Sequence, residues 1–356
     1  MTQHTPRLSA ASLVDSVPAL LGFIPEHSLC LIALGAGGIV RATMRYDLSL
    51  TTGGDLAPDL VVVLGNLGEI ACRNDFRRLV AVIVDDRFDV DDPRYRRVLA
   101  AADEACRVAG GIRQGFVVSE HSANGIWQVV WQPGSRGPTS ARLGDNGVMG
   151  DPRISPTAIA EAFASGRYVL TRRSEMADML APLPHCDSPS CGAPIALRGR
   201  SGPRVPHSDS ADLLRAALAA LDDPPDTCSA VTELARAILT LEVRDALMAC
   251  AVTDQRPAAE ALWRVLARRL RGSARASAAT LLAHLHYIGG EGAYAGVALD
   301  CALDADPTWS MAVLLDRALR NGLHPAELGT MIGECFEVAA RLGVTLPPAT
   351  LTVPAA

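Results

Sequence analysis

Aromatic residues are scarce in this 356-residue chain: they make up 4% of it, whereas 49% of the residues are hydrophobic and 20% are charged. The hydrophobic fraction excludes an intrinsically disordered chain, and the shortage of rings means that any core is built mainly from Ala, Val and Leu. We therefore expect helices that pack through alanine-rich faces. At this length, two domains are expected rather than one large core.

Basic residues are not in excess. Lys and Arg together number 33 and Asp and Glu 39, which gives a formal net charge of −6. Proteins that bind nucleic acid through its phosphates normally carry a broad basic surface. We therefore predict no nucleic-acid partner.

No apolar run is long and uninterrupted enough for a membrane anchor. The best candidate, SVPALLGFIPEHSLCLIALG (16–35), is broken by Pro25, Glu26 and His27, whereas a spanning helix needs about 20 apolar residues. Asp15 and Pro18 argue equally against a secretory signal. The nine cysteines are odd in number and scattered through apolar segments, so we expect them to be small buried hydrophobic residues in a protein kept reduced, not a disulfide framework. We expect a soluble cytoplasmic protein with no membrane partner.

The common catalytic motifs are also missing. The sequence contains no GxSxG, no HExxH, no GxxxxGK[ST], and no GxGxxG that opens a helix after a strand. No catalytic residue is predicted, and the balance of the sequence favours a protein that is not an enzyme.

Proline marks the predicted domain boundary. Residues 182–210 contain six prolines together with several Ser and Gly, a composition typical of a linker. We predict a mixed α/β sheet domain at 8–181, a Pro-rich linker at 182–210 and an all-α domain at 211–346.

The first domain alternates strand and helix patterns. LVAVIV (79–84) is continuously apolar, as in a central strand buried on both faces. The other predicted elements are a helix at 13–21 closed by Gly22, a hairpin of 29–34 with 39–48, helices at 55–71 and 91–111, and strands at 116–118 and 126–131, the last antiparallel. Residues 132–156 predict a long loop, or a hairpin with irregular ends.

The sequence pattern beyond the linker predicts helices throughout. In TWSMAVLLDRALRNG (308–322), five residues share one helical face: Met311, Leu314, Leu315, Ala318 and Leu319. Residues 281–307 predict two helices around a GGEG turn, near the spacing of the second half of a tetratricopeptide unit. Because no second copy is visible, we predict a helix-pair, TPR-like bundle and not a true repeat array.

Acidic residues follow the predicted central strand. Asp85 and Asp86 come directly after it, with Asp89, Asp91 and Asp92 close behind. Open α/β sheets bind ligands at the carboxyl ends of their strands, and neighbouring carboxylates can hold Mg²⁺ with several waters. The alternative is structural, because Asp is favoured in turns and at helix N-termini.

Arginines in the 132–156 segment form a second candidate. Arg136, Arg142 and Arg153 could pair with a phosphate or carboxylate, although a purely structural loop is the alternative. No cofactor and no bound metal are otherwise predicted, since HCDSPSCG (185–192) lacks the paired CxxC knuckles of a zinc site.

A further arginine cluster lies in the helical domain. Five arginines follow one another closely: Arg264, Arg268, Arg269, Arg271 and Arg275. They could contact an acidic partner or phosphate, or they could form a solvated helix face.

Several segments together resemble one known family. They are LVDSVPALLGFIPEHSLCLIAL, GDPRISPTAIAEAFASGR with the following RSEMADML, VRDALM, and the stretch from ASAATLLAHL to ALRNGLHP (276–325). The chain resembles domain of unknown function 4192, a family of actinobacterial proteins. The resemblance implies a soluble intracellular protein of no established activity, and it supplies no site residues.

The sequence thus supports two functional hypotheses. The favoured one is a noncatalytic binding or regulatory protein whose helical domain engages a protein partner. The alternative is a metal-dependent hydrolase or phosphoryl-handling enzyme that uses Asp85 and Asp86 at the carboxyl edge of the sheet with Mg²⁺.

Overall fold

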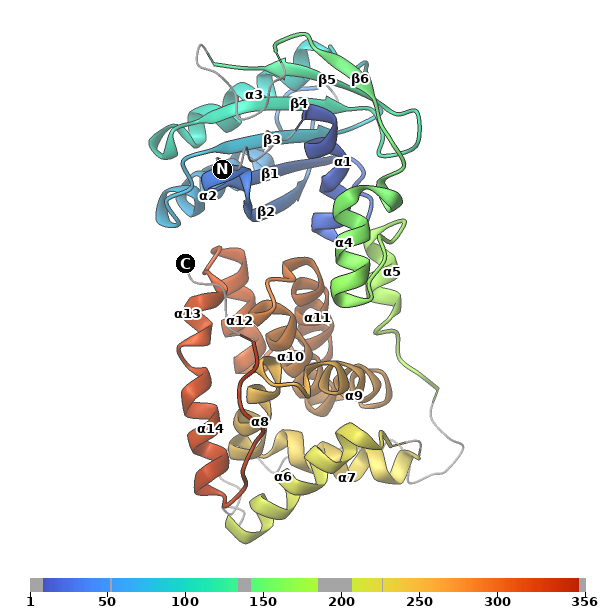
Figure 1. Ribbon diagram of the computed structural model, residues 1–356, viewed down its shortest axis with the longest axis vertical. Coiled ribbons are helices and arrows are strands. Elements are labelled where there is room, and N and C mark those ends of the chain that lie inside the picture. The colour runs from blue at the N-terminus through green and yellow to red at the C-terminus, as the bar shows by residue number, and fades with distance from the viewer. Residues whose placement is uncertain (1–8, 52, 134–141, 185–206, 226, 352–356) are drawn as a thin grey trace, which may run out of the picture. The chain divides into compact units, whose positions relative to one another are not determined.

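The computed structural model describes residues 9–51, 53–133, 142–184, 207–225 and 227–351. The chain divides into two compact units, Met1–Glu175 and Met176–Ala356. The first holds a mixed sheet with helices and the second is helical, which confirms the predicted fold class (Figure 1). Within the described ranges, no helix is long and apolar enough to cross a membrane.

The α/β unit is built on one six-stranded sheet in the order β2-β1-β3-β4-β5-β6. Its strands are β1 (Ser28–Leu34), β2 (Val40–Asp47), β3 (Leu79–Val84), β4 (Ile112–Val118), β5 (Ile126–Trp131) and β6 (Asn146–Val148). Its helices are α1 (Ala10–Leu21), α2 (Pro58–Arg73), α3 (Pro93–Ala105) and α4 (Pro156–Ser165), and α5 (Arg173–Asp178) lies at the division between the units.

The strand pairings confirm the predicted topology. β1 and β2 form an antiparallel hairpin, β3 and β4 run parallel, and β5 is antiparallel to β4. β6 pairs with β5 inside the segment predicted as a loop or hairpin, so the hairpin alternative is correct. Because β1 is antiparallel to β3, the start of β1 lies beside the carboxyl end of β3.

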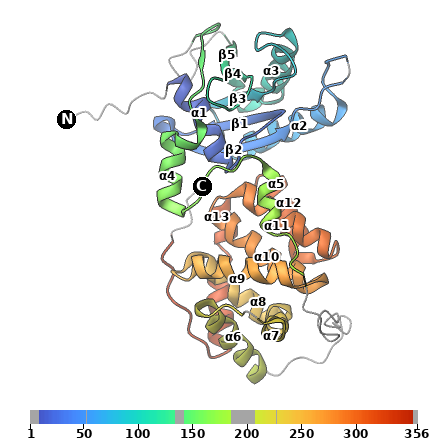
Figure 2. The ribbon, with the colours of Figure 1, turned by 90° about the vertical axis from the view of Figure 1, so that its right-hand side faces the viewer.

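Helices cover both faces of the sheet. α2 and α3 pack on one face, over alternate strand residues such as Leu29, Leu31 and Ile83. α1 lies on the opposite face (Figure 2). All six residues of β3 are buried, as the continuous apolar run predicts for a strand covered on both sides.

Pro18 lies inside α1, where it removes one helical hydrogen bond. The carbonyl that loses its partner is that of Val14, four residues earlier. His121, in the loop after β4, supplies the replacement: its Nε2 lies 3.1 Å from the Val14 oxygen. α1 therefore continues to Leu21, where Gly22 ends it in the left-handed conformation.

Two glycines of α2 provide a test of how closely it packs on α3. A Cβ at Gly68 would overlap the Ala105 carbonyl of α3, whereas a Cβ at Gly65 would meet nothing within 4 Å. We expect Gly68→Ala to lower the free energy of unfolding by about 2–3 kcal/mol, because backbone cannot yield as a side chain can. Gly65→Ala should be neutral or stabilising by up to about 1 kcal/mol. Urea unfolding of both variants checks this, and equal effects would contradict it.

The second unit is a bundle built around one buried helix. α10 (Gly272–Ile288) is buried along nearly its whole length and packs against α9 (Arg256–Arg269) and α11 (Gly292–Ala305). The other helices are α6 (His207–Asp222), α7 (Cys228–Leu239), α8 (Leu241–Leu247), α12 (Ser310–Arg320), α13 (Pro325–Gly329) and α14 (Ile332–Arg341). The predicted face of α12 is only partly buried, since Leu314 is 60% exposed.

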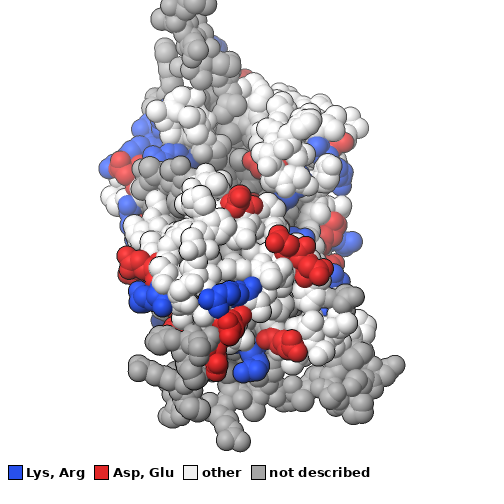
Figure 3. Space-filling view, turned by 60° about the horizontal axis from the view of Figure 1, so that its bottom comes forward, with Lys and Arg blue, Asp and Glu red and all other residues white. Residues whose placement is uncertain are grey.

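The cysteines behave largely as predicted. None of the seven in the described ranges forms a disulfide, and five of them are buried. Cys72 is exposed and Cys228 is half-buried, so the expectation of burial is wrong for these two. On the face that Figure 3 presents, acidic and basic side chains are interspersed, and the described residues there form no single-sign patch.

Candidate metal centre

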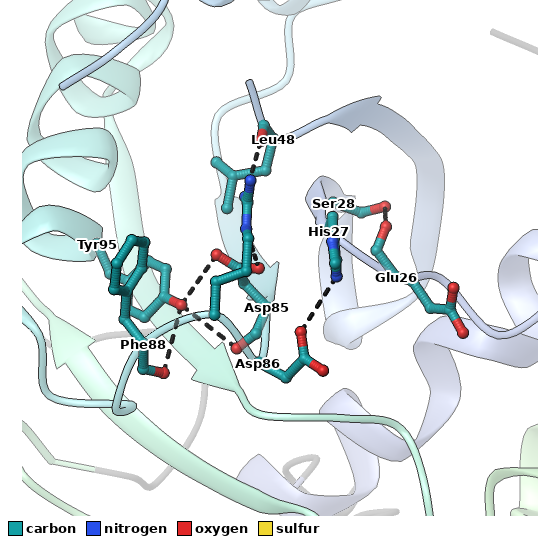
Figure 4. A network of polar contacts seen from close by, with 9 residues as sticks. Glu26, His27, Ser28, Leu48, Asp85, Asp86, Phe88 and Tyr95 are labelled. Atoms are coloured by element: carbon teal, nitrogen blue, oxygen red, sulfur yellow. Dashed lines mark hydrogen bonds and ion pairs between the residues drawn. The ribbon is translucent and has the colours of Figure 1, made fainter. Parts of the chain in front are cut away.

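The sheet register brings His27 to the carboxyl end of β3. Ser28 of β1 is paired with Val84 of β3 in the antiparallel ladder. The residue before Ser28 therefore lies beside the residues after Val84, which are Asp85 and Asp86. A histidine 58 positions away from Asp85 in the sequence thus joins the predicted acidic pair, as Figure 4 shows.

One imidazole and two carboxylates converge at this edge. His27, Asp85 and Asp86 each offer one ligand atom, and these atoms all lie within 4.8 Å of one another. His27 Nε2 is 3.1 Å from Asp86 Oδ1, and the two side chains are 48% and 68% exposed. Imidazole nitrogen and carboxylate oxygen are common ligands of divalent cations, and both are open to solvent here.

Asp85 is the buried member of the group, with its side chain fully shielded from solvent. Its Oδ1 accepts a 2.7 Å hydrogen bond from Arg87 Nε, and its Oδ2 accepts a 2.9 Å bond from the Tyr95 hydroxyl. Arg87 also donates to the Leu48 carbonyl. Burial, with the hydrogen bond to Asp85 next, raises the pKa of Tyr95, so this hydroxyl stays protonated and donates. A carboxylate can accept about four hydrogen bonds and Asp85 accepts two from these side chains, so it keeps capacity for a further ligand.

His27 is held in place by its backbone. Its φ of 43° lies in the left-handed region, which histidine adopts more readily than most residues. The Leu48 amide donates to the His27 carbonyl at 2.7 Å. On the other side, the Ser28 hydroxyl donates to the Glu26 carbonyl at 2.6 Å and accepts from Arg45 Nε at 2.8 Å. These contacts fix the turn that directs the His27 side chain at Asp86.

The remaining acidic residues belong to the start of α3. Asp92 caps that helix: its carboxylate accepts from the Arg94 amide and pairs with the Arg94 guanidinium, both within 2.8 Å. The structural alternative therefore holds for Asp92. Asp89 and Asp91 are exposed and lie outside the three-residue group.

The loop arginines make their described contacts elsewhere. The Arg142 amide donates to Asp145, and Arg153 donates to Asp151 and Thr171. None of these partners belongs to the group around Asp85. Arg136, together with His185, Cys186 and Cys191, lies outside the described residues.

Comparison with known proteins identifies a family. A family model described as a domain of unknown function (DUF4192) matches residues 11–326. This range includes His27, Asp85, Asp86 and both structural units. Neither a curated protein nor a solved structure matches the chain.

Proposed function

Since the chain belongs to the DUF4192 family, whose description assigns no activity, we propose its function from its own residues. We propose that the α/β unit binds a divalent cation through His27, Asp86 and Asp85 and handles an anionic substrate through that cation. The reaction class is that of a metal-dependent hydrolase or phosphoryl-handling enzyme. The observation that carries the proposal is the convergence of three ligand atoms within 4.8 Å.

The spacing of His27 and Asp86 suits a shared cation. Metal–ligand distances of about 2.1 Å place adjacent donors about 3.0 Å apart in an octahedral site and about 3.4 Å apart in a tetrahedral one. The 3.1 Å between His27 Nε2 and Asp86 Oδ1 lies between these values. A cation would replace the hydrogen bond that now joins them, and a small side-chain movement would bring it to Asp85.

The ligand set favours particular metals. An imidazole favours Mn²⁺ or Zn²⁺ over Mg²⁺, which prefers oxygen ligands and keeps its waters. Three protein ligands leave positions open for water and substrate. Asp85 is neutralised by Arg87, so a divalent cation beside Asp86 leaves about one positive charge, which attracts phosphate or carboxylate.

Metal titration tests this proposal. We expect Mn²⁺ or Zn²⁺ to stabilise the wild-type chain by about 2.7 kcal/mol at about 100 times its Kd. That corresponds to roughly 5–10 °C in melting temperature. His27→Ala and Asp86→Ala should lose the shift. Hydrolysis of a simple phosphomonoester or phosphodiester should depend on the same metal.

The matched control is Asp91→Asn, which removes an exposed charge near the site but outside the ligand group. It should keep the full metal response. The cation proposal fails if no divalent metal shifts the melting temperature, or if Asp91→Asn loses the response as completely as Asp86→Ala.

A second candidate function is partner binding by the helical unit. The protein would then be a noncatalytic regulatory protein of the reducing cytoplasm. The lack of a disulfide among the described cysteines supports the reducing compartment. One observation supports the binding role: arginines of α9 and of the turn and helix that follow it hold an extended segment by its backbone. Affinity capture with the full chain and with residues 1–206 should give different partners. The same set from both would count against this function.

A further inference from the structure

The segment that follows α5 is held by three arginines. Arg275 donates to the Leu180 carbonyl at 3.0 Å, Arg268 to the Ala181 carbonyl at 3.3 Å, and Arg271 to the Leu183 carbonyl at 2.7 Å. All of these residues belong to the helical unit. We call the three side chains the arginine surface. Each of these bonds is made to a backbone carbonyl, so this recognition depends on chain conformation more than on side-chain identity.

Leu183 is bound through both of its backbone groups. Its amide donates to the Arg268 carbonyl at 2.9 Å, while its own carbonyl accepts from Arg271. Arg268 lies in the last turn of α9, where helix carbonyls have no partner within the helix. The end of α9 therefore supplies an acceptor beside the arginine donors, and one residue of an extended chain satisfies both.

Proline suits the segment to this surface. Pro182 and Pro184 have no amide hydrogen, and each restricts the residue before it to extended conformations. Between 182 and 184, the Leu183 amide is the one available donor, and it is bonded. A sequence with proline at every second position thus offers its carbonyls to the arginines and leaves few amides that need a partner.

The contact between residues 180–184 and the arginine surface is exposed enough for another peptide to replace the segment. Leu180 is buried, but Ala181, Pro182 and Pro184 are exposed and Leu183 is only half-buried. The Arg268 and Arg271 bonds are also exposed. Hydrogen bonds that water can replace stabilise a contact weakly, so the segment can be displaced by a competitor of the same chemistry.

We propose that the arginine surface is a binding site for an extended, proline-containing peptide of a partner protein, and that residues 180–184 (LAPLP) occupy it in cis as a competitor. This rests on the second proposed function, partner binding by the helical unit, and is independent of the cation site. The partner peptide matches the pattern Leu-x-Pro-Leu-Pro. Because the cis segment is tethered at a high effective concentration, the intact chain binds such a peptide weakly until the segment is released.

A fluorescent peptide of residues 178–185 (DMLAPLPH), titrated with the full-length chain, tests the proposal. The triple variant Pro182→Gly, Leu183→Ser, Pro184→Gly weakens the cis segment at exposed or half-buried positions. We expect it to bind the peptide about tenfold more tightly than the wild type, since each lost proline makes the segment more flexible. Adding Arg268→Ala and Arg271→Ala should remove most of that binding. Melting curves establish that each variant is folded.

The control is Arg264→Ala, on the same helix as Arg268, where Arg264 is paired with Glu260 and not with the segment. In the triple-variant background it should leave peptide affinity unchanged. A peptide with both prolines replaced by glycine should bind about tenfold more weakly. Equal affinity of wild type and triple variant, or undiminished binding by the Arg268/Arg271 variant, overturns the proposal. A partner still captured by that arginine variant would leave partner binding standing and place it on another surface.

Discussion

Replacing Asp85 with alanine should lower the free energy of unfolding of the α/β unit by about 3 kcal/mol. Asp85 is fully buried, and its two oxygens accept from Arg87 and Tyr95. The substitution leaves the Tyr95 hydroxyl buried without this acceptor and Arg87 without its counter-charge. Arg87 is 36% exposed and also bonds Leu48, so we expect the low end of the range for broken buried pairs. Urea unfolding measures the loss.

Asp86→Ala is the matched comparison. Asp86 is the next residue, but its side chain is 68% exposed and its contact with His27 is a surface pair. Such pairs contribute about 0–1 kcal/mol. We therefore expect Asp86→Ala to abolish the metal response with little change in stability, and Asp85→Ala to reduce stability strongly. If the two substitutions cost the same free energy, Asp85 is not the residue that orders this edge of the sheet.

The α/β fold was predictable because its core elements carry strong local patterns. The apolar run at 79–84 and the Gly22 stop correspond directly to a buried strand and a left-handed helix end. The helix at 308–322 was also predicted, but the exposure of Leu314 was not. Spacing along a helix identifies an apolar face, whereas only the packing of neighbouring helices decides how much of that face is covered.

The site was half predictable. Asp85 and Asp86 follow a recognisable central strand, so their position at the sheet edge could be inferred. In the sequence alone, His27 is only an interruption of an apolar run. Its proximity to Asp86 depends on the β1–β3 register, which pairs Ser28 with Val84 across more than 50 residues of sequence. The residue before a strand lies beside the carboxyl end of an antiparallel neighbour. Once the β1–β3 pairing is known, this rule identifies His27 as a candidate ligand.

The arginine cluster shows a different limit. The sequence suggested a phosphate, an acidic partner or solvent for these side chains, but three of them bind neutral backbone carbonyls. Charge alone does not distinguish these partners, because a guanidinium donates equally well to any of them. The proline-rich composition of residues 182–210 predicts a linker, and composition alone does not show which surface an extended segment contacts.

Acidification should destabilise both units, through the buried His121 of the α/β unit and the buried His284 of the helical unit. Burial lowers the pKa of His121 in the α/β unit and of His284 in the helical unit from 6.5 to about 4. Between these values the unfolded chain binds a proton that the folded chain does not, so stability rises with pH there. The stability that each neutral histidine contributes is fully present above pH 6.5. It is lost as the pH falls toward 4, and the loss is about 3 kcal/mol for each histidine.

Leucine substitutions separate the two histidines. His284 Nδ1 is buried and has no hydrogen-bond partner among the described residues, so His284→Leu should cost little at pH 7 and flatten the acid response of the helical unit. His121→Leu should flatten the response of the α/β unit but also cost about 1–2 kcal/mol at pH 7, because the Val14 carbonyl freed by Pro18 loses its donor. Hydrogen exchange resolved by peptide follows each unit between pH 7 and pH 4. An unchanged acid response in the substituted unit would assign the titration to its carboxylates or to its other histidines instead, since these groups also gain protons in that interval.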